Sequence, residues 1–171
     1  MNTGAVTPRQ VVLVLVGVTV GMATAGALLF HRYATRSVPD PNRLAVAPFD
    51  VMVERPGLTT ARVGLAERLT HAVEASGSHT AVPQAAVAAR WRARSTPFIA
   101  AIELARRTGA GLAVYGRVDS APGDSVWVRA AVLDSRSGRG LFEVQALVAT
   151  GAVDRAADTI AVMILRRLRS G

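Results

Sequence analysis

Cysteine is absent from this chain of 171 residues. Its absence excludes disulfide bonds and thiolate metal sites, so the fold must rest on an apolar core. Lysine is absent as well, and arginine supplies every cationic side chain. With alanine as the commonest residue, this is the composition that a GC-rich bacterial genome imposes. The formal net charge is +8, but the arginines are scattered along the sequence, so charge alone identifies no partner.

Recognisable catalytic and cofactor motifs are also missing. No G-x-S-x-G motif occurs, and His71 and His79 lack further ligands at metal-binding spacing. The glycines of residues 109–111 lie between a predicted helix and a strand, where a helix cap is expected rather than a phosphate loop. Three unassigned aspartates fall at predicted strand ends, where turns commonly place them: Asp119, Asp124 and Asp134. We therefore predict no enzyme activity, cofactor or metal, with calcium binding or acid–base chemistry at these aspartates as the alternative.

One long hydrophobic run stands out near the N-terminus. Residues 11–30 carry no charge and are rich in Val, Leu, Gly and Ala, enough for a helix to cross roughly 30 Å of hydrocarbon. A cleaved signal peptide is the alternative, but the apolar run continues past the small residues that would suit a peptidase. The sequence thus predicts an uncleaved anchor and the following organisation: tail 1–10, transmembrane helix 11–31, linker 32–42 and one domain over 43–171.

Small residues on the predicted anchor suggest that it packs against another helix. Gly17 and Gly21 form a G-x-x-x-G pair, and Ala25 extends the same face by one turn. The abundance of small residues throughout the segment explains the pattern equally well, and both interpretations stay open.

Arginines flank both ends of the predicted anchor. Arg9 precedes it, while Arg32 and Arg36 follow it and are candidate contacts to lipid headgroups. By the positive-inside rule, the positive charges on the two sides of the anchor are balanced or mildly favour a cytoplasmic C-terminal domain.

The remaining 130 residues or so have the usual size of a single domain. Hydrophobic periodicity and turn residues predict an α/β (α+β) fold with a mixed sheet in the order βαβαβββα. The expected strands are 44–51, 80–83, 112–118, 126–133 and 141–150. The expected helices are 60–77, 84–93, 97–108 and 153–168.

Several segments of this domain resemble the TolB amino-terminal-like domain. They are residues 44–49 (LAVAPF), residues 104–110 (LARRTGA) leading into 112–118 (LAVYGRV), and residues 126–134 (VWVRAAVLD) followed by Ser137-Gly138 and Leu141-Phe142. The resemblance covers about 43–168. It implies an extracytoplasmic interaction or sensing module of a bacterial single-span protein, generally without chemistry of its own, and so favours a periplasmic domain despite the arginine count.

The most distinctive local surface motif is a tryptophan among arginines. Arg90, Trp91, Arg92 and Arg94 could contact a partner protein or anionic lipid. The alternative, which we favour, is a core tryptophan flanked by solvated arginines. No DNA-reading element accompanies the motif, so we predict no nucleic-acid partner.

These features together predict a non-enzymatic single-span protein of the bacterial inner membrane, cytoplasmic or intracytoplasmic, with a periplasmic domain. Its expected role is that of an accessory subunit whose partners are the lipid bilayer and the subunits of a membrane complex. A photosynthetic reaction-centre and antenna complex is the first candidate, ahead of respiratory and envelope complexes. The alternative function is a membrane-anchored sensor that binds an envelope signal or a small ligand.

Overall fold

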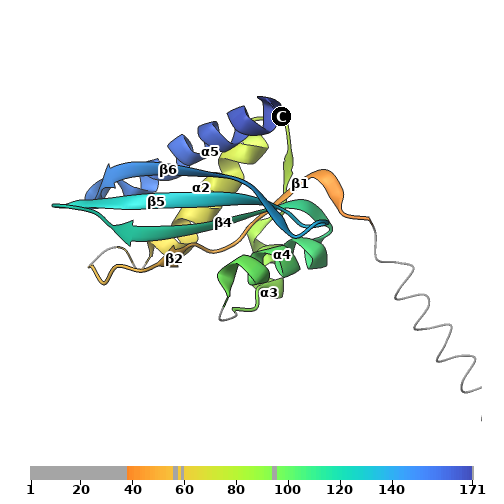
Figure 1. The fold of residues 1–171 in the computed structure, drawn as a ribbon, viewed down its shortest axis with the longest axis horizontal. Helices are drawn as coiled ribbons and strands as arrows, with labels where there is room; N and C mark the ends of the chain where they lie inside the picture. Colours follow the sequence, from red (N-terminus) through yellow and green to blue (C-terminus); the bar gives the residue numbers. More distant parts are fainter. Residues whose placement is uncertain (1–37, 56–57, 59, 94–95, 171) are drawn as a thin grey trace, which may run out of the picture. The chain divides into compact units, whose positions relative to one another are not determined.

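The computed structural model describes residues 38–170, apart from 56–57, 59 and 94–95 (Figure 1). Its strands are β1 (Asp40–Val46), β2 (Asp50–Val51), β3 (Thr80–Ala81), β4 (Ala110–Ser120), β5 (Ser125–Asp134) and β6 (Arg139–Ala149). Its helices are α2 (Ala61–Ala75), α3 (Gln84–Arg90), α4 (Pro97–Thr108) and α5 (Val153–Ser170), with a short 3₁₀ turn at Thr150–Ala152 before α5.

The strands form one mixed sheet in the order β3-β1-β4-β5-β6, and β2 also pairs with β4. β1 is parallel to β3 and β4, while β4, β5 and β6 form an antiparallel meander. The parallel pairs need helical crossovers, which α2 and then α3 and α4 supply. The predicted mixed α/β fold is therefore confirmed.

The first predicted strand is divided in two. β1 ends at Val46, whose partner is Val114, and β2 begins at Asp50, whose partner is Arg117. Pro48 lies between them and cannot donate to the ladder, because proline has no backbone N–H. β1 also starts earlier than expected, at Asp40, within the residues assigned to the linker.

The end of α3 also differs from the prediction, and one prediction falls outside the described residues. α3 ends at Arg90 rather than Ala93, because the backbone turns extended at Trp91. The predicted transmembrane helix, residues 11–31, lies outside the described part of the chain. Within the described part, no helix combines the length and apolar character that a membrane crossing needs.

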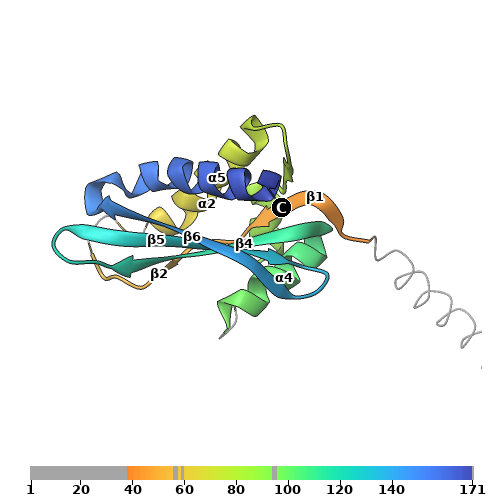
Figure 2. The same ribbon diagram turned by 45° about the horizontal axis from the view of Figure 1, so that its top comes forward.

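One face of the sheet is covered by α2 and α5, which pack against each other (Figure 2). Their apolar stripes meet the inward side chains of four strands, among them Leu44, Val114, Val128 and Val144. Ile160 and Ile164 of α5 are fully buried there. This is the larger of the two core clusters.

The opposite face is covered by α3 and α4, which bury a smaller cluster that includes Leu104, Ala113 and Leu133. α4 ends at Thr108 and is capped by Gly109, whose φ of 71° is the left-handed conformation of a helix C-cap, and β4 follows directly. Both clusters are built entirely from residues of the unit Val38–Gly171. This unit therefore carries its own core.

Candidate functional site: a groove on the open face of the sheet

The face that carries α3 and α4 is only partly covered. α4 has 12 residues and is about 18 Å long, whereas the 11 residues of β4 extend over about 36 Å. α4 therefore shields only part of β4, and α3 is shorter still. The uncovered surface of β4, β5 and β6 on this side is called the open face below.

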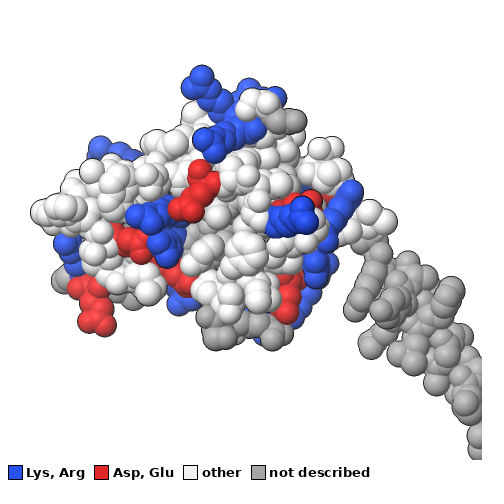
Figure 3. Space-filling model, in the orientation of Figure 1, with Lys and Arg blue, Asp and Glu red and all other residues white. Residues whose placement is uncertain are grey.

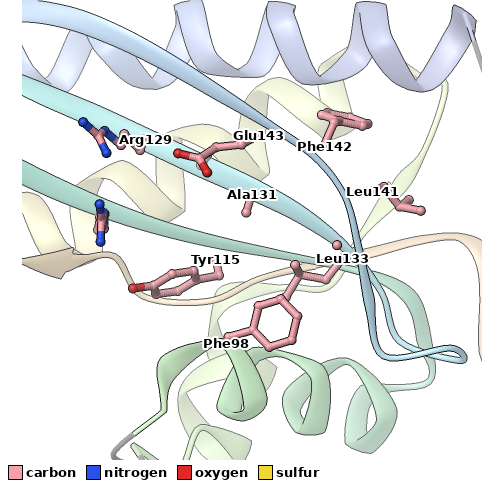
Figure 4. A pocket seen from close by; sticks show the side chains of 11 residues that line it. Phe98, Tyr115, Arg129, Ala131, Leu133, Leu141, Phe142 and Glu143 are labelled. Atoms are coloured by element: carbon pink, nitrogen blue, oxygen red, sulfur yellow. The ribbon is translucent and has the colours of Figure 1, made fainter.

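A groove of about 490 Å³ lies where α4 borders the open face (Figure 4). α4 contributes Phe98, and the three strands of the meander contribute the floor and the far wall. The strand residues that line the groove are Tyr115 and Arg117 of β4, Arg129, Ala130, Ala131 and Leu133 of β5, and Gly140, Leu141, Phe142 and Glu143 of β6.

One end of the groove is apolar. Phe98 and Leu133 lie close together there, and Leu141, which is 51% exposed, stands on the outer strand. The β5–β6 register shifts by one residue at this point and places Gly140 opposite Leu133. Because glycine and the neighbouring Ala131 have little or no side chain, this end is hollow enough to receive an apolar group.

The other end of the groove is charged. Arg117 and Arg129 are direct cross-strand partners, an arrangement that like charges destabilise unless a counter-ion lies nearby. Asp119 supplies that counter-ion, with its Oδ2 at 2.9 Å from Arg117 Nε and 3.6 Å from Arg129 Nε. Asp119 Oδ2 and Arg129 Nε are both buried, and neither makes a hydrogen bond. One carboxylate is therefore shared between two guanidinium groups.

Tyr115 lies between the two ends and has a perturbed hydroxyl. It donates a long hydrogen bond of 3.5 Å to Asp50 Oδ2, and Arg62 pairs with the other oxygen of Asp50 at 3.6 Å. Burial, and after it the negative charge of Asp50, raises the pKa of the Tyr115 hydroxyl above its ordinary value. At neutral pH this hydroxyl is protonated and can take part in hydrogen bonds with a ligand.

The arrangement of these groups is suited to binding. An apolar hollow at one end and a pair of guanidinium groups at the other would hold an apolar group and an anionic group at the same time. The described residues contain no group of three His, Asp or Glu side chains placed to hold a metal ion.

The aspartates and histidines singled out from the sequence have structural partners or lie on the surface. Asp124 pairs with Arg55 at 3.5 Å, and Asp134 accepts hydrogen bonds from the backbone amides of the β5–β6 turn. These amide bonds lower the pKa of the Asp134 carboxyl. His79 Nδ1 lies 3.2 Å from the hydroxyl of Ser78, and His71 is exposed on α2.

The predicted contact motif lies at the end of α3, apart from the groove. Trp91 is half-buried and packs against the smaller core cluster, which is the interpretation that the sequence favours. Arg90 and Arg92 are exposed beside it, and Arg92 donates to the carbonyl oxygen of Trp91 at 2.9 Å. Six of the predicted contact residues lie outside the described residues: Gly17, Gly21, Ala25, Arg32, Arg36 and Arg94.

Sequence reasoning did not identify the groove, although its signal is present in the sequence. Along β4 and β5, polar or aromatic residues alternate with buried apolar ones, as in Tyr115, Arg117 and Asp119. This period of two puts all of them on one face. Locating the groove also requires knowing where α4 stops.

No protein-family model and no curated protein sequence matches the chain. Solved structures with a similar fold include lipoprotein GNA1162 from Neisseria meningitidis, with 18% sequence identity, a TM-score of 0.50, and coverage of 64% of this chain and 81% of that chain. The LpoB C-terminal domain from Escherichia coli has 17% identity, a TM-score of 0.51, and coverage of 66% and 85%. The same domain from Salmonella enterica has 14% identity, a TM-score of 0.50, and coverage of 69% and 91%. At these identities the likeness shows the fold alone.

Proposed function

We propose that this protein is a non-enzymatic accessory subunit of a bacterial membrane complex, anchored by residues 11–31, and that its domain binds another subunit through the groove. The observation that carries the proposal is the groove itself, in which an apolar hollow and the Arg117–Arg129 pair lie on an uncovered sheet face. The similarity of the domain to lipoprotein GNA1162 is compatible with a place in the cell envelope.

The finer parts of the proposal rest on the sequence. They are membership of the TolB amino-terminal-like family, an inner-membrane location and a periplasmic domain. Neither the fold nor the similar structures support a photosynthetic complex, so the partner complex carries no name in the proposal.

The chemistry of the groove indicates what kind of surface the partner presents. An apolar side chain would fill the hollow beside Leu133 and Leu141, and a carboxylate would share the guanidinium groups of Arg117 and Arg129 with Asp119. A protein segment that has an apolar and an acidic residue supplies both groups. Such contacts at the centre of an interface carry most of its binding energy.

Isolation of the tagged full-length protein in mild detergent, with quantitative mass spectrometry of what migrates with it, tests this function. We expect one membrane complex at constant stoichiometry. Leu141→Asp should remove the partner, because it places a charge at the apolar end of the groove, whereas Val162→Asp on α5 should retain it. Both side chains are exposed in the wild type, at 51% and 65%, so the two variants are a matched pair. A protein that purifies alone, or a partner that survives Leu141→Asp, would contradict the proposal.

The location of the domain has a separate test. Protease added to intact spheroplasts should digest the domain if it lies on the periplasmic side, and a cytoplasmic marker protein should stay intact. A domain that is digested only after the spheroplasts are lysed would place it in the cytoplasm.

The second candidate function is a membrane-anchored sensor of a small ligand. It is favoured by the size of the groove, which falls within the range of small-molecule sites. A sensor should be present in less than stoichiometric amounts relative to any complex. A small amphipathic anion should also raise the melting temperature of the wild-type domain. The same anion should not change the melting temperature of the Arg129→Ala variant.

A further inference from the structure

Arginines that are scattered in the sequence meet at one end of the domain. They come from the C-terminal part of α4, the β5–β6 turn and the last turns of α5: Arg106, Arg136, Arg139, Arg166, Arg167 and Arg169. All six are exposed. They are called the arginine-rich end below.

Hydrogen bonds and a cation–π contact hold these segments together at this end. Arg106 Nε donates to the carbonyl oxygen of Ser135 in the β5–β6 turn at 2.7 Å. Arg136 donates from its guanidinium to the carbonyl oxygen of Pro39, just before β1. The guanidinium of Arg167 lies 5.7 Å from the ring centre of Phe142, near the start of β6. Figure 3 shows blue side chains around the C-terminal end of α5 and at the end where β1 begins.

The charges of the arginine-rich end are only partly offset by carboxylates of the domain. Within the described residues, none of its six arginines forms an ion pair. The carboxylates of Asp40 and Asp134, which lie in the same region, accept hydrogen bonds from backbone amides instead. A cationic surface therefore faces the solvent.

The opposite end of the sheet is different in charge. The β4–β5 turn there carries Asp124, which pairs with Arg55, and the exposed start of α5 carries two aspartates, Asp154 and Asp158, with the single arginine Arg155 between them. The domain is therefore polarised, with its excess positive charge at one end.

The arginine-rich end is also the end at which the chain enters the domain. Arg136 contacts Pro39, and the backbone N–H of Asp40 donates to the carbonyl oxygen of Gly109 at the end of α4. The predicted transmembrane helix ends at residue 31, and the seven residues from there to Val38 can extend over at most about 25 Å. The tether is therefore short enough to keep this end close to a membrane surface.

We propose that the arginine-rich end docks on the anionic phospholipid headgroups of the membrane in which the protein is anchored. Anionic headgroups complement the charge of this surface, because guanidinium groups bind phosphate in a bidentate manner. Each arginine close to an anionic bilayer strengthens membrane binding about fivefold. The inference rests on the proposed membrane anchor. It assigns lipid contact to the arginine-rich end rather than to Arg90, Trp91 and Arg92, which lie at the end of α3.

Vesicle binding by the isolated unit 38–171, which contains its complete core, tests the surface without the anchor. In 0.1 M salt we expect it to co-sediment with phosphatidylglycerol vesicles and not with phosphatidylcholine vesicles. Arg139→Glu/Arg166→Glu should weaken the binding at least about 30-fold, because it removes two of these contacts. Arg68→Glu/Arg155→Glu changes the net charge equally, on exposed helix positions outside this end, and should weaken it far less.

Three results would overturn the proposal. They are no binding of the wild-type unit to phosphatidylglycerol, an equal loss in both double variants, and displacement of the unit from the vesicles by a DNA duplex at matched phosphate concentration. The last result would assign the surface to nucleic acid.

A second experiment uses the full chain in phosphatidylglycerol nanodiscs. Because the protein has no cysteine, Ser137→Cys in the β5–β6 turn and Pro122→Cys in the β4–β5 turn each give a single labelling site. Spin-labelled lipid should quench a fluorophore at position 137 and not one at 122. A chain that fails to enter nanodiscs would contradict the proposed anchor. An inserted chain without quenching at 137 would overturn only the docking inference.

Discussion

The two faces of the sheet are built by the same strands but are covered to different extents. On the side of α2 and α5, β5 presents Val126, Val128, Ala130 and Val132, all fully buried. The intervening residues of β5 on the open face, such as Trp127 and Arg129, are only half-buried. The 18 residues of α5 extend over about 27 Å, against about 18 Å for the 12 residues of α4.

This difference indicates a division of labour between the faces. An antiparallel sheet is stable when one face is packed and the other is solvated. The covered face can therefore supply most of the stability, and the open face is free to carry charged and aromatic residues for binding. Substitutions confined to one face test this division of labour.

The largest effect is expected from a cavity in the covered face. Ile160→Ala removes a fully buried side chain between α5 and the sheet and should lower the free energy of unfolding by about 2–5 kcal/mol. Urea denaturation of the unit 38–171, followed by circular dichroism, measures the change. A loss below 1 kcal/mol would contradict the view that the covered face supplies most of the stability of the domain.

The next effect should come from a close contact in the same face. Gly116 of β4 lies against the ring of Phe49, which is 1% exposed, and a Cβ at this position would overlap the ring. Gly116→Ala should destabilise the domain by about 1–3 kcal/mol, because the core must shift to make room. Phe49→Leu in the same background should restore part of the loss, and thermal unfolding of the single and double variants would detect it. An additive loss would contradict the proposed overlap.

A smaller, pH-dependent effect is expected from Tyr115, whose hydroxyl lies in the groove. Because the folded state raises its pKa, the unfolded chain loses this proton first as the pH rises above about 10, and the folded state is then disfavoured. Stability should thus be unaffected below this pH and decline above it. Tyr115→Phe should remove the part of the decline above about pH 10 that Tyr115 causes.

The measurement is direct because Tyr115 is the one tyrosine of residues 38–171; the other tyrosine of the chain is Tyr33. Absorbance at 295 nm should give a titration midpoint above that of free tyrosine. A midpoint at or below the ordinary value would mean that the hydroxyl is not shielded as described.

The sequence predicts the elements of this fold much better than the surfaces they form. Periodicity and turn residues locate α5, α4 and the three strands of the meander, because each signal is local. The break at Pro48 could have been anticipated from the missing N–H of proline. The groove depends instead on the relative lengths and placement of α4 and β4, which no local pattern records.

The arginine-rich end illustrates the same limit. Arg106, Arg136 and Arg166 are about thirty residues apart from one to the next, and the sequence alone shows dispersed charge. The topology brings them together, because α4, β5 and α5 all finish at the end where β1 begins.

The smallest effect on stability is expected from a substitution on the open face. Leu147 of β6 is 53% exposed and pairs across the strands with Trp127. Leu147→Ala deletes an apolar side chain, as Ile160→Ala does, but leaves no cavity because solvent already reaches the site. It should cost less than about 1 kcal/mol, the range of a cross-strand pair, in the same urea measurement. A loss as large as that of Ile160→Ala would mean that the open face contributes to the core, and that its uncovered residues are not free to serve a partner.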